Sequence, residues 1–130
     1  MIILDTHVFI WALSDPDRLS RNALRTIRRA SPSGGIGIAS ITLWEVALLV
    51  QRGRIRVRGI AESWIREAVD ASGVTVREIT APIAALAVQL PEAFPRDPAD
   101  RLIAATAIVE RVSLVTSDER LRCPSLRTVW

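Results

Sequence analysis

The chain alternates short, almost wholly apolar runs with longer segments that have helical periodicity. Strands that are apolar on both faces are typical of a parallel sheet covered by helices on both sides. The sequence therefore predicts an α/β fold, a three-layer sandwich with a central parallel sheet of four or five strands, in one domain over residues 1–130. The segments that we interpret as strands are residues 2–4, 36–40, 74–79, 113–117 and 127–130.

The intervening segments carry helix start and stop signals. Ser20 is placed as an N-cap, Asp97 precedes a proline at the first helical position, and Gly53 and Gly73 follow the last apolar positions of their segments. A short helical turn is expected at "DERL", after the fourth strand. The expected longer helices cover residues 6–13, 20–31, 41–53, 60–73, 81–91 and 97–111.

The composition indicates the size of the core and the cellular compartment in which we expect the protein. Hydrophobic residues make up 49% of the 130 residues, which is ample for one core. No apolar run reaches the roughly 18 residues of a membrane span, and Met1 leads directly into an apolar run without basic residues, so we expect no signal peptide. The single Cys123 excludes an internal disulfide, which fits a reducing compartment. We expect a cytoplasmic protein that does not enter a membrane.

All 17 basic residues are arginine, and the formal net charge is +3. Arginine suits bidentate contacts to phosphate, so a nucleic acid is a plausible partner, although a GC-rich genome would produce the same bias. Ordinary solvated arginine remains the alternative at each position. The candidates for RNA contact are Arg25, Arg28 and Arg29 on one helical face, and Arg54 and Arg56 in a connector.

Acidic residues from four segments converge on one edge of the predicted sheet. Asp5 and Asp118 each follow a strand directly, and Glu45 lies one turn into the helix after the second strand. Asp97 and Asp100 open the last long helix. Because the carboxyl ends of parallel strands share one edge, these acids should lie near one another, where α/β sheets bind ligands.

Each acid also has a structural interpretation. Asp5, Asp97 and Asp118 could cap helices, Asp100 could interact with a helix dipole, and Glu45 could pair with a buried arginine. Two carboxylates ~4 Å apart repel by about 4 kcal/mol at an effective dielectric of 20. Either the acids stay apart, therefore, or a divalent cation gathers them, and oxygen ligands suit Mg²⁺ or Mn²⁺.

The histidine, the cysteine and the tryptophans are explained more simply by structural roles than by chemistry. The sole His7 and sole Cys123 make a zinc site improbable. His7 is expected to make a structural hydrogen bond. The tryptophans at positions 11, 44 and 64 are expected in the core or at an interface, because they lie in apolar or amphipathic helices.

Four stretches resemble the PIN-domain family, specifically the VapC-type toxins of toxin–antitoxin pairs: "LDTHVFIWAL", "ASITLWEVALL", "PRDPADRLIAATA" and "LVTSDERL". The resemblance implies a parallel α/β sandwich that forms a homodimer, a Mg²⁺- or Mn²⁺-dependent ribonuclease, an RNA substrate and a cognate antitoxin. In this sequence the family's acidic quartet, which holds the metal and carries catalysis, corresponds to Asp5, Glu45, Asp100 and Asp118. Thr6, Asp97 and Ser117 correspond to supporting positions.

Rival classes of protein lack required residues. A response-regulator receiver needs a lysine, and the chain has none; a haloacid-dehalogenase-type phosphatase needs an aspartate where His7 stands. The alternative that survives is a non-catalytic α/β protein-binding module whose acidic cleft receives arginines from a partner.

Overall fold

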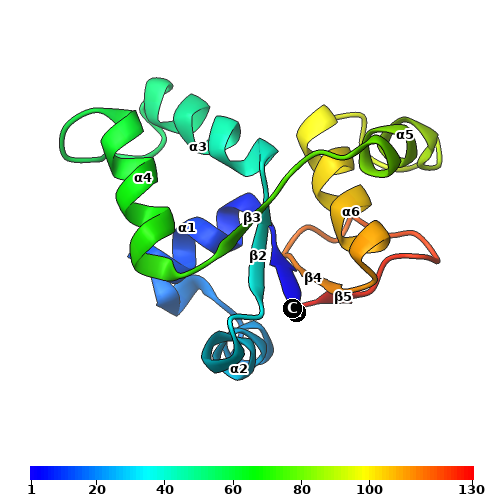
Figure 1. Ribbon diagram of the computed structural model, residues 1–130, viewed down its shortest axis with the longest axis horizontal. Coiled ribbons are helices and arrows are strands. Elements are labelled where there is room, and N and C mark those ends of the chain that lie inside the picture. The colour runs from blue at the N-terminus through cyan, green and yellow to red at the C-terminus, as the bar shows by residue number, and fades with distance from the viewer.

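The computed structural model describes residues 1–130 and has five parallel strands in the order β3-β2-β1-β4-β5 (Figure 1). The predicted three-layer α/β sandwich is confirmed, with five strands. None of the helices combines the length and the apolarity that a membrane span requires. The strands are β1 (Ile2–Leu4), β2 (Ile36–Ala39), β3 (Thr75–Arg77), β4 (Ser113–Val115) and β5 (Thr128–Val129). The α-helices are α1 (Thr6–Ser14), α2 (Arg21–Ala30), α3 (Ile41–Gln51), α4 (Ala61–Ser72), α5 (Ala81–Gln89) and α6 (Pro98–Glu110), and two 3₁₀ turns are η1 (Pro16–Arg18) and η2 (Ser31–Ser33).

The sheet separates two apolar cores. On one side Leu4 and Ile38 pack with residues of α1 to α4, and on the other Ile3 and Leu114 pack with residues of α6. Figure 1 shows α1 and α4 on one side of the strands, α5 and α6 on the other, and α2 beneath the lower end of β2. Every residue of β1 and β2 is buried, which explains why these strands are apolar on both faces.

β1 lies at the centre of the sheet, where the topology switches direction. The chain moves outward from β1 to β2 and β3, and then crosses through α5 and α6 to β4 on the other side of β1. Leu4 is in register with both Ile38 and Val115. The crevice beyond the carboxyl ends of β1 and β4 is therefore the position where such sheets bind ligands.

Two predicted elements differ most from the structure, and the fourth and fifth strands are also shorter than predicted, at Ser113–Val115 and Thr128–Val129. "DERL" forms a turn because the Asp118 carboxylate accepts hydrogen bonds from both the backbone and the side chain of Arg120, and Pro124 follows shortly after. The third strand is shorter than residues 74–79: it pairs only with β2, over Thr75–Arg77, and Thr80 already serves as the N-cap of α5.

Candidate active site

A cleft of about 550 Å³ lies at the carboxyl edge of the sheet, and we call it the acid cleft. It contains all four acids that the sequence singled out, together with Asp97 and Ser117, while Thr6 lies buried beneath them. Four separate segments of the chain thus meet at the topological switch point. The residues of the acid cleft are Asp5, His7, Trp11, Arg18, Glu45, Asp97, Asp100, Ser117, Asp118 and Arg120.

Asp5 is held by the strand register. Because Leu4 pairs with Val115, the next residues along the two strands are neighbours, and the Thr116 hydroxyl donates to Asp5 Oδ2 at 2.6 Å. Asp5 also serves as the N-cap of α1, where its Oδ1 accepts from the Thr6 amide at 2.8 Å. Only 8% of Asp5 is exposed, and this burial raises its pKa despite both hydrogen bonds.

Glu45 reaches the cleft from the second turn of α3. Its Oε1 accepts a 2.5 Å hydrogen bond from the Thr6 hydroxyl, which also lies 3.1 Å from the hydroxyl of Thr42. Desolvation raises the pKa of Glu45, and the nearby Asp5 carboxylate raises it further. Thr6 therefore joins the acid that follows β1 to the acid on α3, donating to Asp5 through its amide and to Glu45 through its hydroxyl.

The start of α6 positions two acids. Asp97 is the N-cap, and its Oδ1 accepts from the Ala99 amide at 2.8 Å and from the Asp100 amide at 3.4 Å. The half-buried Asp100 side chain forms no salt bridge, and desolvation followed by repulsion from Asp97, Asp5, Glu45 and Asp118 raises its pKa to about 7.

Arg101 does not neutralise Asp100, although the two are adjacent in sequence. Its guanidinium donates instead to backbone carbonyls of the segment that joins α5 to α6. This network anchors the segment preceding the N-cap of α6, while the charge of Asp100 remains uncompensated. The acceptors are the carbonyl oxygens of Ala87, Leu90, Pro91, Phe94 and Pro95.

Asp118 differs from the other three acids because it has a cationic partner. The Arg120 guanidinium donates to both carboxylate oxygens, at 3.0 Å and 2.7 Å, and the Arg120 amide donates at 2.9 Å. These hydrogen bonds lower the pKa of Asp118. The ion pair is exposed on the Arg120 side, so it is weak and easily exchanged for another partner.

The four acids line the same cleft, but their carboxylates do not converge on a single point. No three histidine, cysteine, aspartate or glutamate side chains stand close enough together to hold a metal ion. Mutual repulsion favours this spacing, since the acids raise one another's pKa. Their oxygen-only chemistry nevertheless fits Mg²⁺ or Mn²⁺, with Asp5, Glu45, Asp100 and Asp118 as the candidate ligands.

These pKa shifts predict how the stability of the metal-free protein depends on pH. Asp5, Glu45 and Asp100 hold their protons to higher pH when folded than when unfolded, so the free energy of unfolding should fall as pH rises from about 4 to about 7. Asp118 has the opposite sign, and its stabilisation is lost only as pH falls below about 4. Asp100 accounts for on the order of 2 kcal/mol of this fall in the free energy of unfolding, once its partial exposure to solvent is allowed for.

Thermal melts in EDTA at pH 5 and pH 8 check this prediction. We expect the lower melting temperature at pH 8. A melting temperature that rises between the two values would show that the carboxyl groups are not desolvated as described.

The predicted RNA contacts divide into two groups. Arg54 and Arg56 lie in a second groove, of about 500 Å³, which shares His7, Trp11 and Arg18 with the acid cleft. We call it the arginine groove. Its other residues are Ile10, Ser14, Asp15, Leu49, Ile55 and Trp64.

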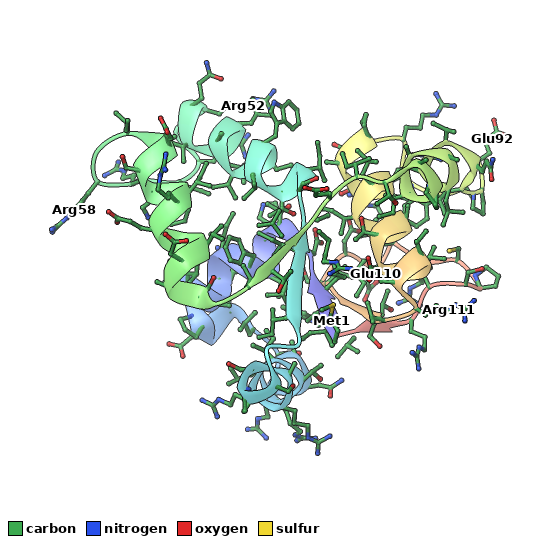
Figure 2. The ribbon with its side chains drawn as sticks, viewed as in Figure 1. Met1, Arg52, Arg58, Glu92, Glu110 and Arg111 are labelled. Atoms are coloured by element: carbon green, nitrogen blue, oxygen red, sulfur yellow. The ribbon has the colours of Figure 1, made fainter.

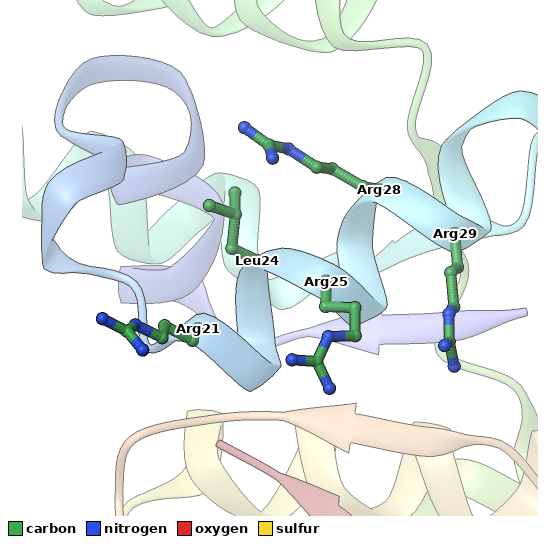
Figure 3. Close-up of a pocket in the computed structure, with 5 residues that line it drawn as sticks. All are labelled: Arg21, Leu24, Arg25, Arg28 and Arg29. Carbon is green, nitrogen blue, oxygen red and sulfur yellow. The ribbon is translucent and has the colours of Figure 1, made fainter.

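The second group, Arg25, Arg28 and Arg29, lies elsewhere. Together with Arg21 and Leu24 these residues form a separate surface on α2 that shares no residue with the acid cleft (Figure 3). The reason is topological: α2 leads into the start of β2, so its last turn lies toward the amino-terminal edge of the sheet, where Met1 also lies (Figure 2). The structure does not bring these three arginines to the acids.

Sequence reasoning missed several residues of the acid cleft. His7, for which a structural hydrogen bond was expected, is exposed and packs against Trp11 with 5.8 Å between ring centroids. Arg120, two residues after Asp118, could have been identified from that spacing, whereas nothing in the sequence indicated that Arg18 would reach the cleft. Trp11 and Trp64 are half-buried against the core, while Trp44 is 57% exposed.

A parallel sheet with acids from four segments at its switch point defines a class of protein. The PIN domain model matches residues 2–123, and the chain belongs to the PIN-domain family. Over 132 aligned residues it is 42% identical to Ribonuclease VapC22 of Mycobacterium tuberculosis, covering 99% of this chain and 98% of that protein. The resemblance drawn from the four motifs is confirmed.

Solved structures share the fold. VapBC2 from Rickettsia felis, bound to a DNA fragment from its promoter, matches with a TM-score of 0.71 at 21% identity, covering 98% of this chain and 97% of that chain. FitAcB from Neisseria gonorrhoeae matches with a TM-score of 0.63 at 22% identity, covering 98% and 96%. At these identities the likeness shows the fold alone.

Proposed function

We propose that this protein is a metal-dependent endoribonuclease that acts as the toxin of a toxin–antitoxin pair. The observation that carries the proposal is the meeting of Asp5, Glu45, Asp100 and Asp118 in one cleft at the switch point of the sheet. The 42% identity to a ribonuclease over nearly the whole chain supports the same activity. The substrate is RNA, whose phosphodiester bonds the enzyme hydrolyses.

The acid cleft would hold Mg²⁺ or Mn²⁺ through Asp5 and Asp100, with Glu45 and Asp118 bound directly or through water. A bound divalent ion supplies Lewis acidity toward a phosphate oxygen and lowers the pKa of water. Asp97 keeps the start of α6 in place through its hydrogen bonds to the Ala99 and Asp100 amides. We expect Ser117 to support the same site from the segment that leads to Asp118.

The side-chain contacts favour Glu45 over Asp118 as the group that accepts the proton of the attacking water. Both oxygens of Asp118 are bonded to Arg120. Glu45 uses one oxygen to accept from Thr6, which leaves the other for a water molecule. Thr6 fixes the carboxylate plane of Glu45 through this hydrogen bond.

The partners follow from the same proposal. A cognate antitoxin would hold the activity in check, and the structural neighbours include a toxin–antitoxin complex from Klebsiella pneumoniae. We expect a homodimer that acts in the cytoplasm. The exposed Trp44 and Val88, at 57% and 80%, are apolar side chains that such an interface would cover.

Cleavage of RNA by the purified chain tests the proposal. We expect fragments in Mn²⁺ or Mg²⁺, none in EDTA, and none with Glu45→Gln in either condition. Asp70→Asn is a matched control, because Asp70 is an exposed acid on α4 outside the cleft. Equal cleavage by the Glu45→Gln variant would refute the assignment of the site.

The alternative of a non-catalytic module has one observation in its favour. The pairing of Arg120 with Asp118 shows that the cleft accepts a guanidinium group. An arginine supplied by a partner protein could take the same position. Under this alternative the chain binds its partner tightly and cuts no RNA in any metal.

A further inference from the structure

His7, Trp11 and Arg18 form the boundary between the acid cleft and the arginine groove, and they belong to both. His7 and Trp11 lie one turn apart on α1, and Arg18 ends the 3₁₀ turn that follows. The two hollows therefore adjoin each other at these three residues. A chain-like ligand with one end at the acids would pass over these three side chains.

Arg18 is a cation at this boundary that has no ionic partner. Its guanidinium carbon lies 4.6 Å from the centroid of the Trp11 ring, and the side chain takes part in no salt bridge or hydrogen bond. Arg120 is instead engaged by Asp118, and Arg101 by backbone carbonyls. Arg18 is thus free to offer its donors to an anionic group.

The rings at the boundary offer stacking surfaces. Trp11 is half-buried and packs against the core, which anchors its indole, and its ring centroid lies 6.0 Å from that of Trp130. His7 is exposed and tilted by 49° against Trp11. Aromatic side chains anchored in this way are the usual platforms for unpaired bases.

Beyond the boundary the groove continues with positive charge. Arg54 and Arg56 line it, and both side chains are exposed and unpaired. Three arginines along one path suit successive phosphates better than a single bound anion. The half-buried Ile55 and Trp64 give the groove an apolar floor for a base or sugar.

We infer that His7, Trp11 and Arg18 form a nucleotide subsite that receives the residue of single-stranded RNA next to the phosphate held at the acids. Arg18, held over the Trp11 ring, would bind the flanking phosphate, a base would stack on the exposed ring of His7 beside Trp11, and the strand would continue toward Arg54 and Arg56. The inference rests on the proposed function, and it specifies an unpaired strand because duplex bases are already stacked on one another.

The test separates RNA binding from chemistry. Binding of a fluorescent 12-nucleotide single-stranded RNA is measured in EDTA for the wild type, His7→Ala, Arg18→Gln and the double variant. Cleavage in Mn²⁺ is then measured on the same RNA and on bis(p-nitrophenyl) phosphate, which is too small to reach the subsite. Arg127→Gln is the matched control, because Arg127 is exposed and lines neither hollow.

We expect the double variant to bind the RNA at least tenfold more weakly and Arg18→Gln to reduce the salt slope of log Kobs by about 0.7. The loss of kcat/KM on the RNA should exceed the loss on the small diester at least tenfold. Unchanged binding and an unchanged salt slope would overturn the inference, as would a wild type that does not bind the RNA. Failure of the wild type to cleave either substrate would count against the proposed function instead.

A protein segment is the other occupant that this groove could take. If the variants bind RNA normally but lose affinity for a partner protein, the groove is a protein interface and the inference is wrong. Both side chains are exposed, so unchanged melting temperatures should accompany either result.

Discussion

Replacing Asp100 with Asn is expected to abolish RNA cleavage while raising the melting temperature of the metal-free protein. Asp100 is half-buried, lacks a cationic partner and has a pKa raised to about 7, so above that pH its charge destabilises the fold. The neutral amide removes this cost, on the order of 1–2 kcal/mol at pH 8 once solvent screening is allowed for. Loss of a metal ligand should reduce cleavage by at least about a hundredfold.

The two effects are measured by melting in EDTA at pH 8 and by cleavage of RNA in Mn²⁺. Asp70→Asn serves again as the control and should change neither. The opposite changes in activity and stability are informative, because a variant that merely unfolds loses both. A destabilised Asp100→Asn protein would show that the carboxylate has a stabilising partner that the structure lacks.

Mn²⁺ should stabilise the protein strongly, and the effect should depend on Asp5. A ligand at a hundred times its dissociation constant adds about 2.7 kcal/mol to the free energy of unfolding, which corresponds to a rise of about 10 °C for a domain of this size. A bound ion would also offset the repulsion that, together with the larger effect of desolvation, raises the pKa of Asp100. Metal binding needs deprotonated carboxylates, so the stabilisation should grow between pH 5 and pH 8, opposite to the trend in EDTA.

Thermal melts across a Mn²⁺ titration measure this effect without any RNA. Asp5→Asn should lose most of the shift, while the Asp70→Asn control should keep it. An absence of any shift in the wild type would leave the non-catalytic alternative as the better account of the cleft.

The fold was predictable because the signals were local. Strands buried on both faces have to be apolar, and the N-cap signals at Ser20 and Asp97 marked real helix starts. The convergence of Asp5 and Asp118 followed from parallel pairing alone, since carboxyl ends share an edge. The hydroxyl of Thr116, which fixes Asp5, could be assigned only once the register of β1 and β4 was known.

The features that the sequence did not predict depend on the directions in which long side chains and helices point in the folded protein. Arg18 reaches the acid cleft by a path set by a 3₁₀ turn, and Arg120 folds back on Asp118 in a turn that had been expected to be helical. The arginines of α2 looked equivalent to Arg54 and Arg56 in the sequence. The direction in which α2 leads into β2 separates them, and a charge pattern does not encode that direction.

The segment that follows β4 completes the cleft. The hydrogen bond between Thr116 and Asp5 spans 111 residues, and Asp118 follows β4. A polypeptide still being synthesised therefore has its first acid but not its last, and β1 lacks the neighbour that fixes Asp5. Under the proposed activity, a chain whose synthesis stops before residue 118 lacks one acid of the cleft and is expected to cleave no RNA.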